Sequence, residues 1–97
     1  MLLAETDKKR KRTKDPLAVS IGRNIRLFRD ALEMKQEEVA DAADISFICI
    51  SRYENGWQVP SVENLIVLAR VLRRSVGDLL EEQMFLPSRG DLFVGVA

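Results

Sequence analysis

The sequence predicts an all-α fold of five helices in one domain, and three observations support this. In the middle of the chain, apolar residues recur at intervals of three and four, which places them on one face of a helix. Serine or aspartate, the residue types that favour helix N-caps, precede four of the five segments. The chain has 97 residues, 46% of them hydrophobic, which suffices for one hydrophobic core.

The first helix is expected to begin at Pro16, because proline suits the first helical position and Asp15 before it is a good N-cap. Its predicted apolar face has members at spacings of three and four, namely Leu17, Ile21, Ile25, Phe28 and Leu32. The charged residues Arg23, Arg26 and Asp30 point away from that face.

Two short helices follow. The first runs from Gln36 to Ala43 and carries acidic residues in its first turn, where they interact favourably with the helix dipole. Asp44 interrupts it, and Ser46 is a good N-cap for the next helix, which runs to about Asn55. Gly56 can take the positive φ that ends this helix. Two short helices joined by a turn of about three residues form a helix-turn-helix motif.

The last two helices are each opened by a serine. Ser61 caps a helix that we expect to be central in the core, because its apolar residues cover three sides: Val62, Leu65, Ile66, Leu68, Ala69 and Leu72. Ser75 and Asp78 are spaced like a capping box and open a short fifth helix that ends near Leu80.

The positive charge of the chain is concentrated at the N-terminus, although the net charge is zero. Residues 1–16 contain six Lys/Arg and three Asp/Glu (net +3), residues 17–80 eight and nine (−1), and residues 81–97 one and three (−2). The run from Lys8 to Arg12 repels itself, so we expect residues 1–15 to form a flexible basic arm. Residues 16–82 then form the helical domain, and residues 83–97 an apolar C-terminal extension.

Composition argues against several classes of protein. With no histidine and one cysteine, the chain lacks the usual zinc ligands and cannot form an intrachain disulfide. It has no apolar run near the roughly 20 residues of a membrane span, and its N-terminus lacks the apolar region of a signal peptide, so we expect a cytoplasmic protein. A glycine-rich phosphate loop and a nucleophile beside a base are also missing, so we predict neither catalysis nor a cofactor or metal.

Several motifs, in order and spacing, resemble the Cro/C1 (XRE-type) repressor family. They are Gln36 to Ala40, Ile45-Ser46, Ile50 to Gly56, Pro60 to Leu65 and Leu72 to Leu80, within a region of roughly residues 19 to 82. The resemblance implies a phage-repressor-like helix-turn-helix fold. It also implies a small transcriptional regulator that binds double-stranded DNA, with recognition helix 47–55 in the major groove. A homodimer would suit such a regulator, because two-fold dimers read two half-sites about 34 Å apart.

The resemblance assigns roles to individual residues. Gln36 would anchor a DNA phosphate, or simply open its helix, and Asn55 would touch the DNA backbone, or simply end its helix. Arg29 and Glu54 match a partly buried structural salt bridge. Arg52 is a candidate for a guanine or a phosphate. The complete set of predicted DNA-binding residues is Lys35, Gln36, Ser46, Phe47, Ile48, Ser51, Arg52 and Asn55.

Phe47 and Ile48 depart from the family pattern, because related proteins generally carry polar side chains at the start of the recognition helix. Two apolar side chains cannot read hydrogen-bond donors and acceptors, but they can pack on thymine methyl groups. Alternatively, they form an apolar patch for a protein partner, as in an antitoxin-like or co-regulator module with the same fold. A third interpretation places them in the core.

Two turns also depart from the family. Asp44 stands where the helix-helix turn usually carries a glycine in the left-handed conformation, which aspartate tolerates better than most residues. Arg73 and Arg74 replace the usual glycine and apolar residue before the fifth helix, and we expect a solvated turn there, with a second phosphate contact as the alternative. Cys49 is expected to be a packing residue.

The two ends of the chain keep several interpretations. The basic arm either seeks phosphates or the minor groove, or only increases solubility. The apolar stretch from Leu92 to Val96 packs on its own chain, completes a dimer, or is disordered.

Overall fold

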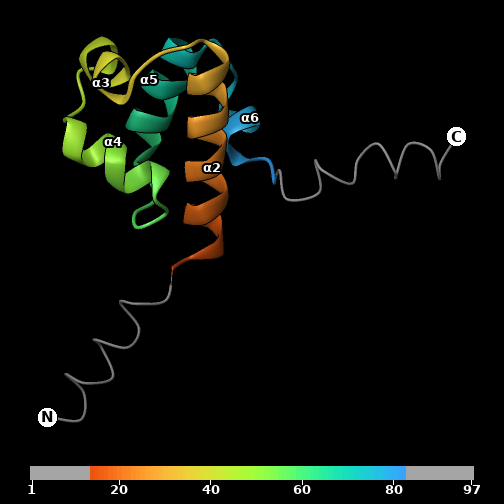
Figure 1. The fold of residues 1–97 in the computed structure, drawn as a ribbon. Helices are drawn as coiled ribbons and strands as arrows, with labels where there is room; N and C mark the ends of the chain where they lie inside the picture. Colours follow the sequence, from red (N-terminus) through yellow and green to blue (C-terminus); the bar gives the residue numbers. More distant parts are fainter. Residues whose placement is uncertain (1–13, 83–97) are drawn as a thin grey trace, which may run out of the picture.

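The computed structural model describes residues 14–82, and within them it has five α-helices and no strand (Figure 1). The helices are α2 (Pro16–Ala31), α3 (Gln36–Ala43), α4 (Phe47–Glu54), α5 (Val62–Leu72) and α6 (Val76–Leu80). The predicted all-α, five-helix fold is therefore confirmed. The predictions for the basic arm before Lys14 and for the apolar extension from residue 83 onward lie outside the described residues.

The four predicted N-caps are present. The Asp15 carboxylate accepts a hydrogen bond of 2.8 Å from the Leu17 amide, and the Ser46 and Ser61 hydroxyls each accept one of 3.1 Å from the amide three residues later. Ser75 and Asp78 form the predicted capping box, with reciprocal bonds of 3.0 and 3.1 Å. Each bond satisfies an amide that the helix leaves without a partner, so the sequence places these helix starts accurately.

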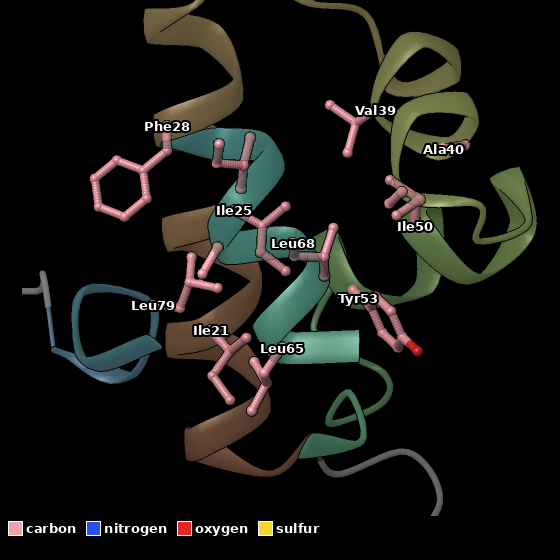
Figure 2. Close-up of a cluster of buried hydrophobic side chains, with 13 residues drawn as sticks. Ile21, Ile25, Phe28, Val39, Ala40, Ile50, Tyr53, Leu65, Leu68 and Leu79 are labelled. Carbon is pink, nitrogen blue, oxygen red and sulfur yellow. The ribbon is translucent and has the colours of Figure 1, made fainter. Parts of the chain in front are cut away.

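All five helices contribute to one hydrophobic core (Figure 2). The longest helix, α2, packs against α4, α5 and α6, with α4 and α6 on opposite sides of it in Figure 1, while α3 packs against α4 and α5. The largest fully buried apolar side chains are Ile21, Ile25, Ile50, Leu68, Leu72, Leu79 and Val39. This arrangement places α3 and α4 together at one edge of the domain.

The prediction was wrong about some apolar positions. Leu17, on the expected face of the first helix, is 46% exposed, and on α5 the side chains of Val62 and Ile66 are 72% and 40% exposed. Periodicity identifies which residues share a face, but burial requires a neighbouring element on that face. In the described part of the chain α5 packs against α2, α3 and α6, which leave the side of Val62 and Ile66 uncovered.

Three turns use left-handed backbone at residues other than glycine, and the first of them follows α2 at Glu33, with φ 57°. Asp44 ends α3 with φ 58°, as predicted, and Arg73 ends α5 with φ 61° in the place where the family usually has glycine. Arg74 follows and lies over the Phe28 ring, 4.5 Å from its centroid. The Arg73 side chain is exposed, which agrees with a solvated turn.

One buried polar residue was missed by the sequence analysis. Asn24 is completely buried, and its side-chain amide donates to the carbonyl oxygens of Leu79 (2.7 Å) and Glu81 (2.5 Å). It thus fastens the end of α6 to the middle of α2. Its position on the buried face, three residues after Ile21 and four before Phe28, was the available signal.

Within the described residues, no helix is both long and apolar enough to span a membrane.

Candidate nucleic-acid interface

The helix-turn-helix motif consists of α3, a three-residue turn and α4. Asp44 takes the left-handed conformation directly after α3, and the Ile45 amide then donates to the Ala40 carbonyl at 3.0 Å. Ile45 packs against the core from within the turn, and Ser46 caps α4. The turn is therefore set by one left-handed residue, one apolar contact and one cap.

The two faces of α4 differ sharply. Ile50, Tyr53 and Glu54 are buried against the domain. The other face carries five of the predicted DNA-binding residues, at positions that share one side of a helix: Phe47, Ile48, Ser51, Arg52 and Asn55. Phe47 and Ile48 are 46% and 60% exposed, so the interpretation that placed them in the core is wrong.

The polar side chains on this helix make local hydrogen bonds. The Ser46 hydroxyl accepts from the Cys49 amide at 3.1 Å, so its cap role occupies one lone pair. The side-chain amide of Asn55 donates to the Ser51 hydroxyl at 3.4 Å across one turn. Asn55 is the C-cap with a right-handed φ of −84°, and the positive φ of 78° belongs to Gly56. The side chain of Arg52 is exposed on the same face.

Lys35 and Gln36 lie at the start of α3. The Lys35 amide donates to the Glu38 carboxylate at 2.7 Å, which completes the first turn, and Lys35 is exposed. The Gln36 side chain is half-buried, and its amide nitrogen donates to Glu54 Oε1 at 2.9 Å. Gln36 therefore links the first residue of α3 to the last residue of α4.

Glu54 is the centre of a buried charged network. Its side chain is fully buried and accepts hydrogen bonds from Arg29 Nε at 2.6 Å and from Arg29 Nη2 at 3.0 Å, which is the pair expected from the resemblance. A third hydrogen bond from Arg29, from Nη1, reaches the Met34 carbonyl at 2.8 Å. Arg26 Nε also donates to Glu54, at 3.3 Å. The network joins α2, α3 and α4 into one unit.

The electrostatics of this network favour the charged forms of both partners. Burial alone would raise the pKa of Glu54, but the hydrogen bonds from Arg29, Gln36 and Arg26 and the charge of Arg29 outweigh it and lower this pKa below its ordinary value of 4.5. The hydrogen bond to Glu54 raises the pKa of Arg29 above its ordinary value, so this guanidinium stays charged. Sequence analysis missed Arg26, although its position one turn before Arg29 was a usable signal.

A family model described as helix-turn-helix matches residues 25–79, more than half of the chain. The chain belongs to the helix-turn-helix family of the Cro/C1 (XRE) type. The predicted phage-repressor-like fold is thereby confirmed, and the domain is a DNA-binding domain of transcriptional regulators.

Three solved structures illustrate the similarity of this helix-turn-helix chain to known regulators. The clp gene regulator ClgR from Corynebacterium glutamicum is 28% identical over 87% of this chain and 93% of its own, with a TM-score of 0.68. The P22 c2 repressor, solved in complex with a synthetic operator, is 31% identical over 63% of this chain and 92% of its own, with a TM-score of 0.61. The restriction-modification controller protein C.AhdI from Aeromonas hydrophila is 26% identical over 64% and 94%, with a TM-score of 0.62. No curated protein sequence matches the chain.

Proposed function

We propose that the protein binds specific sequences of double-stranded DNA as a small cytoplasmic transcriptional regulator, with α4 in the major groove. The exposed face of α4 carries this proposal, because Phe47, Ile48 and Arg52 project from it while Ile50 and Tyr53 anchor the opposite face in the core. In helix-turn-helix domains the second helix of the motif reads base edges with its N-terminal residues. The similar P22 c2 repressor was solved with operator DNA.

Residues at the ends of the motif would contact the phosphates that flank the bases. Lys35 and Gln36 lie at the N-terminus of α3, where the helix dipole favours an anion, and Asn55 lies at the end of α4. Gln36 uses one N–H on Glu54, and its side-chain amide retains a second N–H that can donate to a phosphate. Glu54 would thus orient Gln36 for DNA.

The bases would be read by a mixed set of side chains. Arg52 is exposed one turn after Ile48 and suits the two acceptors of guanine. Phe47 and Ile48 would pack on thymine methyl groups, which gives a preference for thymine near the start of α4. A protein-contact patch is the second candidate for Phe47 and Ile48, because the two exposed apolar side chains are adjacent.

We further infer that the working unit is a two-fold dimer, since dimers of such domains read two half-sites about 34 Å apart. The apolar extension of residues 83–97, which lies outside the described residues, is one candidate for the contact between subunits. The uncovered apolar side of α5, with Val62 and Ile66, is a further surface for this purpose.

Binding to random duplex DNA across a salt series, followed by selection of a preferred sequence, tests the function. We expect binding that weakens steeply with salt, and Arg52→Ala should reduce affinity for the selected sequence by about 1 to 3 kcal/mol. Arg70→Ala, which removes an exposed arginine from α5, is the matched control and should change affinity little.

The role of Phe47 and Ile48 is tested with the same selected duplex after uracil replaces thymine, which removes only the methyl groups. Wild-type affinity should fall, and Ile48→Ala should make the protein less sensitive to the replacement, with the remaining sensitivity lost when Phe47→Ala is added. Absence of binding even at about 50 mM salt would disprove the DNA function and leave the protein-contact patch as the explanation.

A further inference from the structure

We propose that a basic cleft between α2 and the turn after α4 binds an additional phosphate of the DNA backbone. The cleft is lined by Val19 and Gly56 and by the polar residues Lys14, Arg23, Arg26, Glu54 and Asn55. The proposal rests on the proposed DNA-binding function and extends its footprint beyond α3 and α4. Arg23 and Arg26 are not among the predicted DNA-binding residues, and Lys14 is the last cation of the predicted basic arm.

Lys14 is held at one edge of the cleft by two contacts. The ammonium group of Lys14 lies 4.3 Å from the centroid of the Trp57 ring, close enough for a cation-π interaction. Its Cδ lies 3.6 Å from the point where a Cβ on Gly56 would be. Lys14 therefore packs along the turn that follows α4. The described residues therefore begin beside the end of α4. In the sequence, one residue separates Lys14 from the basic run Lys8 to Arg12.

The opposite wall of the cleft carries two arginines of α2. Arg23 and Arg26 are three residues apart, so they share one side of the helix, and both are exposed. Arg26 uses Nε on Glu54, and its side chain remains 54% exposed, which leaves its outer N–H groups open to solvent. These groups can donate to a phosphate without breaking the Glu54 network.

The charge of the cleft favours an anion. Glu54 is the one acidic residue that lines it, and this carboxylate is already paired with Arg29, which lies outside the cleft. Arg26 shares this carboxylate, so the three cations of the cleft outnumber its one acidic residue. Its volume of about 310 Å³ equals on the order of ten water molecules, which is room for a phosphate group with part of its hydration shell.

A DNA phosphate is the anion that the position of the cleft favours. Asn55 belongs both to the cleft and to the exposed face of α4, so a strand that follows this face toward its C-terminal end reaches Arg23 and Lys14 next. The cleft is also open to one side, as binding of a polymer backbone requires. A free phosphate ion offers the same chemistry, so the experiment has to separate the two sources.

The test is the salt dependence of binding to a fixed duplex by full-length wild type, Arg23→Gln and Lys14→Gln. Each phosphate contact contributes about 0.9 to the slope of log affinity against log salt. Either variant should therefore reduce the slope by about one. Its affinity deficit relative to wild type should shrink by about threefold to fourfold between roughly 50 and 200 mM salt. Arg70→Gln, which removes the same charge from α5, should retain the wild-type slope.

The outcomes distinguish this proposal from the proposed function. Equal slopes for Arg23→Gln, Lys14→Gln and Arg70→Gln, with intact wild-type binding, would overturn the cleft assignment and leave the DNA-binding function standing. Absence of wild-type binding would overturn both. Calorimetric binding of inorganic phosphate that is lost in Arg23→Gln, together with an unchanged slope on DNA, would assign the cleft to a free anion and also overturn the proposal.

Discussion

Glu54 shows how a single residue serves both the fold and the interface. Its carboxylate is fully buried, yet it is the last residue of α4 and accepts hydrogen bonds from α2 and α3. The bond from Gln36 fixes the start of α3 relative to α4, and these two points border the proposed DNA surface. Loss of the carboxylate would leave Arg29, whose side chain is only 13% exposed, without its charge partner.

The stability of the domain should therefore depend on the protonation of Glu54. Because folding lowers the pKa of Glu54 below 4.5, the carboxylate stabilises the folded state above that pH, and this stabilisation is lost as the pH falls through the lowered pKa. Glu54→Gln should lower the free energy of unfolding at neutral pH by about 3 kcal/mol. It should also flatten the decrease of stability below pH 4.5.

Urea unfolding of wild type and Glu54→Gln between neutral and strongly acidic pH measures both effects. Glu63→Gln, which changes an exposed carboxylate on α5, is the control and should remain within about 0.5 kcal/mol of wild type. If wild type and Glu54→Gln lose stability in parallel on acidification, other carboxylates control the acid transition and the prediction is wrong.

At the scale of elements, the crossing of α2 and α4 depends on Gly22. This residue is buried, and a Cβ added to it would lie 2.0 Å from the Tyr53 carbonyl oxygen and 2.9 Å from that of Glu54. These are backbone atoms, so they cannot move aside as a flexible side chain would. The close approach places the α2 arginines within reach of Glu54, and thus connects helix packing to the charged network.

Gly22→Ala should therefore destabilise the domain, although alanine favours helices by about 1 kcal/mol over glycine. We expect a loss of about 1 to 3 kcal/mol from overpacking, because α2 and α4 have to separate. Gly77→Ala in α6 is the matched control. Its added Cβ would meet only the Ser75 hydroxyl at 3.6 Å, so its stability should be equal or higher. Thermal unfolding of the two variants compares them directly, and equal melting temperatures would contradict the importance of the crossing.

At the scale of the whole molecule, charge and apolar surface are unevenly distributed. The N-terminal 16 residues carry a net charge of +3, whereas the remainder of the chain is net negative. Phe47 and Ile48 are exposed on α4, and Val62 and Ile66 are exposed on α5. This distribution suits a protein that meets DNA with one surface and a second subunit with another.

The proposed dimer can be tested on the full-length chain. We expect sedimentation equilibrium to give a dimer at micromolar concentration, and Phe93→Asp in the apolar extension to shift it toward the monomer. Phe47 lies on the proposed DNA surface, so the Phe47→Glu variant should leave the dimer intact. A wild-type monomer at all concentrations, or a dimer unaffected by Phe93→Asp, would contradict the role proposed for the extension.

Local interactions made much of the fold predictable. Asp15, Ser46, Ser61 and Ser75 hydrogen-bond to amides within three residues, so their cap roles can be recognised from neighbouring sequence. The left-handed Asp44 is equally local, since it has to end α3 within a short turn. The expectation that Val62 and Ile66 would be buried failed, because their exposure depends on which helices reach that side of α5.

Interactions between residues close in the chain set where the helices begin, which residues share a face, and that α3, a three-residue turn and α4 form the motif, so all of these could be predicted from the sequence. The contacts of Arg26 and Gln36 with Glu54, the burial of Asn24 beneath α6 and the meeting of Lys14, Arg23 and Asn55 in one cleft could not, because they join segments that lie far apart in the chain. Lys14 and Asn55 belong to segments far apart in sequence, and only the close packing of α2 on α4 at Gly22 brings them together.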